Sequence, residues 1–272
     1  MDEQRISRTG QIKVYFGKCL RLFVNEKQWS CFISTVIIMV IISMVTGDEM
    51  FESYGPTKSG VFAIVSACIW IGLFNSIRSI CKERAIIKRE HRSGLHISSY
   101  ILAHVGYEAV LCLGETLIVL LIMLIKNHAH LPDSGLVFPL FVDLFLSFFL
   151  VMFAADMLAL LVSCVVKDEN MAMTVMPFVL IVQLVMSGSV FELTGLTNLI
   201  SYITVSHWGM NAVLSIACTD FVVRQQANWY EAEGVSASAG NVLMIWLVLL
   251  FFILLYIALA GLFLKQVDRD QR

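Results

Sequence analysis

Four acidic residues lie inside long apolar stretches of this 272-residue sequence, and they are the first candidates for chemistry. Glu108 and Glu115 are seven residues apart, so a helix would place both on one face, about 10 Å apart along its axis. Asp143 and Asp156 occupy the next apolar stretch. Carboxyl groups inside a membrane are costly, so they indicate either a path for ions or protons or a polar network between helices.

The sequence places no basic residue in the core of these stretches to complete a proton relay. We therefore favour the polar network, with the carboxyls paired to Ser or Asn side chains or to Arg78. Asn75 and Gln183 are amide candidates in neighbouring stretches. A proton-coupled antiporter, which would use the same carboxyls in its transport path, stays open as the alternative.

A second candidate is residues 82–100, KERAIIKREHRSGLHISSY, which carry five Lys/Arg, two Glu and two His between two apolar stretches. Positive residues close to membrane spans are retained on the cytoplasmic side. Mixed-sign charge at helical spacing suits docking onto another charged protein. We therefore expect a cytoplasmic partner at this segment, and a motor subunit is the natural candidate.

The elements that position these residues must lie mostly in lipid, because 58% of the residues are apolar and the mean hydropathy is +0.80. Only 15% are charged and the formal net charge is -2, which excludes the basic field of a nucleic-acid-binding protein. The seven Cys are scattered without a CxxC pair and are typical of small core residues. The composition predicts an all-α membrane protein, with no cleavable signal peptide in residues 1–30.

Bilayer thickness predicts the spans, since a hydrocarbon core of about 30 Å requires roughly 20 apolar residues per helix. Six such stretches are bounded by charges or turn residues, namely 30–46, 60–80, 97–125, 136–166, 171–191 and 241–264. We expect residues 1–272 to form a single permease domain with six transmembrane helices. The charged segment then forms a cytoplasmic helix between the second and third spans.

The distribution of Lys and Arg predicts that both termini are cytoplasmic. In this orientation only 3 of the 19 basic residues lie outside, namely Lys58, Lys126 and Arg224. The opposite orientation would leave most of the positive charge on the wrong face of the membrane.

Two further elements are expected outside the spans. Residues 11–29 place apolar residues on one helical face and Lys or Arg around the rest, so residues 1–29 are expected to hold an amphipathic helix lying along the membrane. A solvated basic tail is the alternative. In the outer region, residues 192–240, Leu196, Leu199 and Ile203 repeat at helical spacing, which predicts short re-entrant helices between the fifth and sixth spans.

Several strings, in the same order over nearly the whole chain, resemble the membrane domain of the G subfamily of ABC transporters. They are ICKER at 80–84, EHRSGLHISSYILA at 90–103, MSGSVFELTGL at 186–196 and ISYITVSHWGMNAV at 200–213. The resemblance implies the permease of a type-2 ABC exporter. In such exporters two permease domains pair around a central path, and two ATPase domains drive inward-to-outward switching.

No phosphate-binding loop of the form GxxxxGK[ST] occurs in the sequence. The nearest string, Gly17-Lys18-Cys19, has Ile12 where the first Gly is needed and ends in Cys. We therefore expect no catalytic residue and no cofactor in this chain. ATP and Mg are expected on a partner ATPase subunit, present in two copies, beside a second permease chain in a homo- or heterodimer.

The resemblance places the family's cytoplasmic connecting and coupling helices on five charged residues, Glu83, Arg84, Lys88, Arg89 and Glu90. Their expected role is to transmit ATPase closure through charge-assisted hydrogen bonds, which hold geometry better than neutral ones. The alternative is a solvated charged face that anchors the chain to lipid head groups.

The resemblance also implies a substrate path and a gate. The path positions carried over are Ile71, Asn75, Ile181 and Leu184. The plug between the inner cavity and the outer exit falls on Ser189 and Val190, which are smaller than the family's bulky pair, so Phe191 is an alternative closing residue. An apolar lining suits an amphipathic or lipid-like cargo, although residues that only pack helices have the same pattern.

Other chemistry is sparse. His128 and His130 form an HxH with no further ligand nearby, so no metal site is expected. The motifs HExxH, GxSxG and CxxC are missing from the sequence, which disfavours an enzyme. We expect a multi-pass protein of a plasma or inner membrane, of bacterial source, that exports a peptide, lipid or drug-like substrate. An ion- or proton-coupled secondary transporter is the alternative.

Overall fold

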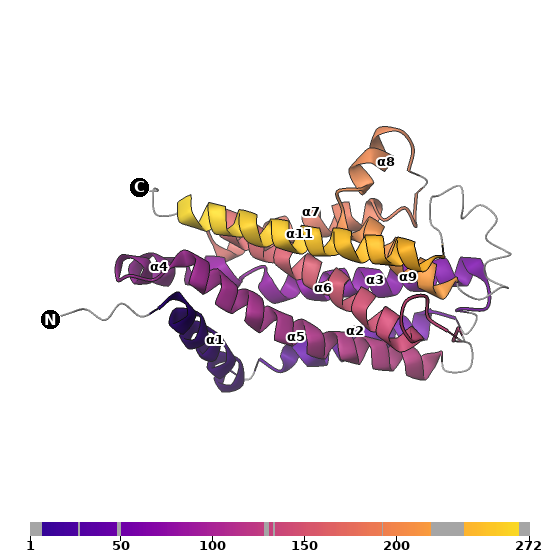
Figure 1. Cartoon of the computed structure of the whole chain (residues 1–272), viewed down its shortest axis with the longest axis horizontal. Coiled ribbons are helices and arrows are strands. Elements are labelled where there is room, and N and C mark those ends of the chain that lie inside the picture. Colours follow the sequence, from indigo (N-terminus) through magenta and orange to yellow (C-terminus); the bar gives the residue numbers. More distant parts are fainter. Residues whose placement is uncertain are drawn as a thin grey trace.

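The computed structural model describes residues 7–26, 28–47, 50–127, 131–132, 134–191, 193–218 and 237–266, and all regular structure in these ranges is α-helical (Figure 1). The helices are α1 (Arg8–Asn25), α2 (Ser30–Val45), α3 (Tyr54–Ser76), α4 (Ser79–Arg92), α5 (Ile97–Lys126), α6 (Leu140–Val165), α7 (Glu169–Val185), α8 (Leu196–Ser201), α9 (Val205–Ala217) and α11 (Ala239–Gln266). The prediction of an all-α protein is confirmed.

Four helical stretches of the described chain are long and apolar enough to cross a membrane, namely Tyr54–Arg92, Ile97–Lys126, Leu140–Val165 and Ala239–Lys265. A fifth is added if α1 and α2, which are bent by 68°, form one broken span. The helices α2 and α7 are shorter, with 16 and 17 residues. At 1.5 Å per residue they reach roughly 24–26 Å, less than the ~30 Å of the hydrocarbon core. The chain is a multi-span membrane protein, and the number six stays a prediction.

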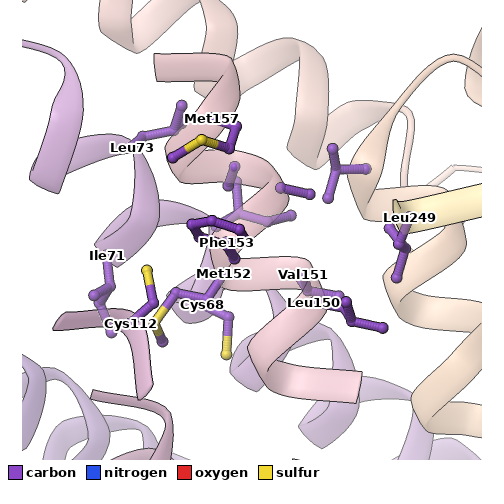
Figure 2. Close-up of a cluster of buried hydrophobic side chains, with 14 of the residues drawn as sticks. Cys68, Ile71, Leu73, Cys112, Leu150, Val151, Met152, Phe153, Met157 and Leu249 are labelled. Atoms are coloured by element: carbon purple, nitrogen blue, oxygen red, sulfur yellow. The ribbon is translucent and has the colours of Figure 1, made fainter. Parts of the chain in front are cut away.

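The core of the bundle is built around α6, which packs against α3, α5, α9 and α11. Nearly every inward position of α6 is fully buried, and Figure 2 shows part of this core with side chains from α3, α5, α6 and α11. Gly72 lets α3 approach α6 closely, because a Cβ there would overlap the carbonyl oxygen of Met152. Small residues at such crossings are what packing between membrane helices requires.

The two ends of the bundle differ in character. The helices α1 and α4 and the C-terminal end of α11 lie at one end, while α8 projects from the side of the bundle toward the other end (Figure 1). All residues of α8 except Ser201 are exposed. One end therefore carries the charged helix α4, whereas α8 exposes the apolar side chains of Leu196, Leu199 and Ile200.

Two of the predicted spans do not match the boundaries of the helices in the structure. The stretch 60–80 is divided, because α3 ends at Ser76 and α4 begins at Ser79 after a two-residue break. The stretch 171–191 is helical only to Val185, and Gly188 then adopts a φ of 76°, which interrupts the helix. Residues 186–191 and 193–195 therefore form no regular helix between α7 and α8.

Candidate coupling face and buried carboxyl cluster

The charged helix α4 follows α3 directly and ends where its sequence predicts. Arg89, His91 and Arg92 lie in its last turn, where positive charge stabilises the helix dipole. Gly94 follows with a φ of 103°, a conformation that glycine adopts without strain at the end of a helix. The helix is therefore regular from Ser79 to Arg92, and its three faces have different surroundings.

One face of α4 is bonded to α1 and α5. The Tyr15 hydroxyl donates to Oε2 of Glu90 at 2.7 Å, and the Tyr100 hydroxyl donates to Oε2 of Glu83 at 2.8 Å. The Lys18 Nζ lies 3.5 Å from the same Glu83 oxygen. The two acidic residues predicted to couple to an ATPase therefore bond within the chain and hold α1 in place.

A second face of α4 is bonded to the end of α6. The Arg84 guanidinium donates to the backbone carbonyl of Val166, the residue that follows α6. The Ser163 hydroxyl accepts hydrogen bonds from the backbone N–H groups of Ile80 and Cys81, both at 3.1 Å. Sequence reasoning did not find Ser163, because no local pattern links it to a helix 80 residues earlier.

The third face of α4 is exposed and positively charged. We call Lys82, Ile86, Arg89 and Arg92 the basic stripe, since all four are exposed and follow one another at helical spacing. Arg89 belongs to the predicted coupling set, and Lys88 lies half-buried beside it. The i, i+4, i+7 spacing of the first three residues was the signal that could have identified the stripe from sequence.

The carboxyls of α5 and α6 meet between α3, α4, α5 and α6. Glu108, Glu115 and Asp156 are each at most 1% exposed. The amide of Asn75 donates to Glu115 Oε2 at 2.6 Å, and the Ser79 hydroxyl donates to Glu108 Oε1 at 3.3 Å. The structure thus brings together Glu108, Glu115, Asp156 and Asn75 of the predicted polar network. Asp143 and Gln183 lie elsewhere, and Arg78 pairs with Glu169 at 3.0 Å.

Each carboxyl of this cluster has one oxygen without a hydrogen bond of good geometry, although the hydroxyls of Ser76 and Thr35 lie close to the cluster. These atoms are Glu108 Oε2, Glu115 Oε1 and Asp156 Oδ1, and the Ser76 hydroxyl is likewise buried without a hydrogen bond of good geometry. The second oxygen of Asp156 accepts from the Cys112 thiol at 3.3 Å. Within the described chain, no set of three His, Cys, Asp or Glu side chains is arranged to hold a metal ion.

Asp143 is separate from this cluster and lies in the first turn of α6. Its carboxylate accepts three backbone hydrogen bonds, from Leu136 at 2.7 Å, Val137 at 3.0 Å and Phe138 at 2.9 Å. A carboxylate that accepts several backbone N–H groups fixes the conformation of the segment that donates them. Asp143 therefore holds the loop that enters α6.

The predicted path residues lie in two different environments. Ile71 is 4% exposed within the core of Figure 2, and Asn75 is half-buried. On α7, Ile181 is exposed and Leu184 is partly buried. The structure does not bring these four into one described pocket, so their role stays a prediction.

The predicted gate residues follow α7 in the irregular segment. Val190 and Phe191 are exposed, and Ser189 is half-buried. Nearby, Gln183 ties α7 to α9, since its Oε1 accepts the backbone N–H of Ser206 at 3.1 Å. His128 and His130 lie outside the described residues.

Comparison with known proteins identifies relatives of this chain. The chain is 28% identical over 232 residues to the ABC transporter ATP-binding/permease protein Rv1747 of Mycobacterium tuberculosis (strain ATCC 25618 / H37Rv), an alignment that covers 81% of this chain and 27% of that protein. The chain therefore matches about a quarter of the length of this relative. The model of the ABC-2 type transporter family matches residues 10–218, which include the charged helix, the carboxyl cluster and α7. The chain belongs to the ABC-2 type transporter family, as a membrane domain.

Proposed function

We propose that this chain is the permease subunit of an ATP-driven exporter that moves a hydrophobic or amphipathic substrate, such as a lipid, a peptide or a drug-like molecule, by alternating access. The observation that carries this proposal is the basic stripe on α4. It is exposed, and it lies on a helix that continues directly from the membrane-spanning α3. Movement of this stripe can reach the membrane helices through α4 itself, because two residues join α4 to α3 and hydrogen bonds join it to the end of α6.

The distribution of charge on α4 supports an acidic partner at the stripe. Glu83 and Glu90 are bonded to residues of α1 and α5, whereas Lys82, Arg89 and Arg92 are exposed on another face of α4. Complementary charge speeds association and selects the partner. Ile86, which is 38% exposed, adds an apolar contact within the same face.

The partner expected at the stripe is an ABC ATPase that binds ATP and Mg. Permease domains of this family work with ABC ATPase domains. The mycobacterial relative is named as an ATP-binding and permease protein, which supports an ATPase closely associated with this chain. We propose two ATPase subunits and a second permease chain, with ATP hydrolysed on the ATPase subunits.

The arrangement proposed for the membrane has six spans, both termini cytoplasmic and α1 along the inner surface. The short helices α2 and α7 can span if the bilayer thins locally, which costs a fraction of a kcal/mol per Å. Ile181 and Leu184 on α7, with Ile71 and Asn75 on α3, are the proposed path. Ser189, Val190 and Phe191 are the proposed gate. The membrane is proposed to be the plasma or inner membrane of a bacterium, as the mycobacterial relative suggests.

The test is purification of the tagged chain from its native membrane in mild detergent, with an assay of vanadate-sensitive ATP hydrolysis. We expect a stoichiometric ATPase to co-purify with the wild type. The double variant Lys82→Glu/Arg89→Glu should lose both the ATPase and the hydrolysis. Lys265→Glu, which reverses an exposed charge at the C-terminal end of α11, is the control and should retain both. A fully folded double variant that retains the partner would overturn the role of the stripe.

An ion- or proton-coupled secondary transporter is the second candidate, and the buried carboxyl cluster is the observation that favours it. This function requires no ATPase. It predicts that the chain purified alone and reconstituted in vesicles transports along an imposed ion gradient, and that Glu108→Gln removes this transport. If transport required ATP and survived in Glu108→Gln, the cluster would be structural.

A further inference from the structure

The two-residue break between α3 and α4 is the starting point. Arg78, which precedes the first residue of α4, makes no side-chain cap to the helix. The first N–H groups of a helix have no partner within it and must find one elsewhere. Here Ile80 and Cys81 donate their N–H groups to Ser163 Oγ at 3.1 Å each. A residue of α6 therefore caps α4.

The carbonyl side of the same break is also bonded. The Cys81 thiol lies 3.5 Å from the carbonyl oxygen of Arg78 and 3.8 Å from that of Ile77, close enough for weak S–H hydrogen bonds. Breaks in a helix persist where a side chain enters the backbone ladder and satisfies the freed groups. The break is thus stabilised by Ser163 from one side and by Cys81 from the other.

The contacts around Ser163 join α4 to the corner between α6 and α7. Arg84, one turn further along α4, donates to the Val166 carbonyl at the end of α6. Asp168 then caps α7, since its Oδ1 accepts the N–H of Met171 at 2.8 Å. The backbone of α4 is therefore linked to α6 by buried hydrogen bonds, whereas only two residues connect it to α3.

We propose that Ser163 is a positioning residue that makes the α3–α4 break a hinge and transmits movement of α4 to the α6–α7 corner. This inference rests on the proposed function, in which an ATPase moves α4. When α4 tilts about the break, the Ser163 and Arg84 bonds pull on the end of α6, and α7 moves with it. Ser163 contacts no substrate and acts only through the backbone of α4.

A structural role alone would also place Ser163 at this contact, so the test needs a readout beyond stability. The readout is the rate at which a thiol reagent labels Met171→Cys, an exposed position in the first turns of α7. It is measured in the complete complex with the ATPase, without nucleotide and after trapping with ATP and vanadate. Cys31 is replaced by Ser in all variants, because it is half-buried, whereas the other six cysteines are buried.

Two variants carry the test. Ser163→Thr and Ser163→Val have nearly the same shape and differ in the hydroxyl, so both face the same packing change. Ser147→Ala is the control, because it removes another buried hydroxyl of α6, one that accepts the Trp246 Nε1–H at 2.9 Å. The wild type, Ser163→Thr and Ser147→Ala should change their labelling rate on trapping. Ser163→Val should hydrolyse ATP while this change is lost.

A nucleotide-dependent rate in Ser163→Val equal to that of Ser163→Thr would overturn the inference and leave the proposed function intact. If the wild type itself bound no ATPase, or its labelling rate did not respond to trapping, the proposed function would fail and the inference with it. If Ser163→Val lost ATP hydrolysis as well as the labelling change, Ser163 would support assembly of the complex and not transmission, which also contradicts the proposal.

Discussion

Asp143 and the carboxyl cluster are both buried acids in apolar helices, yet they have opposite surroundings. Asp143 accepts three backbone hydrogen bonds through its two oxygens. Glu108, Glu115 and Asp156 are bonded to side chains instead, and each has one oxygen without a hydrogen bond of good geometry. The difference teaches that a buried acid can either fix the backbone or take part in a polar cluster between helices. Only the groups that donate hydrogen bonds to it distinguish the two cases.

The largest effect is expected for Asp143→Ala. The variant removes the acceptor of three part-buried backbone hydrogen bonds, and a hydrogen bond to a charged group contributes about 1.5–3 kcal/mol. We expect the free energy of unfolding to fall by roughly 3 kcal/mol or more. Thermal unfolding in detergent measures it, with Asp143→Asn as the milder control because its amide keeps one acceptor. A variant as stable as the wild type would show that the loop does not depend on this carboxylate.

Gly135→Ala should disturb the same loop from the other side. A Cβ at this position would lie 2.6 Å from Asp143 Oδ2 and would overlap the Phe138 carbonyl oxygen. Forced overlap of this kind costs about 1–3 kcal/mol, so a clear drop in melting temperature is expected. Gly240→Ala is the control, since no atom lies within 4 Å of its added Cβ. Equal melting temperatures for the two variants would refute the close packing of the loop.

Trp246→Phe should have a smaller effect. Its indole N–H donates to Ser147 at 2.9 Å, and its ring stacks on Phe138 with the centroids 6.4 Å apart. Phe keeps the aromatic ring and loses the hydrogen bond, so we expect a loss of about 1 kcal/mol. Trp246→Leu, which also loses the stacking, should be less stable in the same unfolding assay. The opposite order would show that the ring contact does not support the loop.

The smallest effect on stability is expected for Glu108→Gln in the cluster. The substitution keeps a carbonyl oxygen for the Ser79 hydroxyl and removes no backbone acceptor, so stability should change by less than about 1 kcal/mol. Glu115→Gln should behave alike, since the Asn75 amide can still donate to it. ATP-driven transport should survive in both variants. If the variants folded but lost transport, the cluster would be part of an ion path and not only structural.

The sequence predicted the all-α class and the family correctly, because apolar length and residue strings are properties of the chain itself. Four of the six predicted spans correspond to helical stretches that pass the criteria of length and apolar character, and the family match covers the quoted strings. Whether the short helices α2 and α7 cross the membrane could not be predicted from their length, because a bilayer can thin around a short helix. Helical periodicity predicted that Glu108 and Glu115 share one face of a helix. It did not predict that Asp156, and not Asp143, lies beside them.

The roles of individual charges were decided by tertiary structure. Glu90 lies beside Arg89 in sequence, yet it bonds Tyr15 of α1, whereas Arg89 is exposed. Asp143 appeared equivalent to Asp156 until the loop before α6 supplied its donors. Hydropathy and periodicity are local, so the sequence determined that these residues lie on helices in a membrane. Which partner each side chain meets depends on segments tens of residues away, and only the packing of the helices decided it.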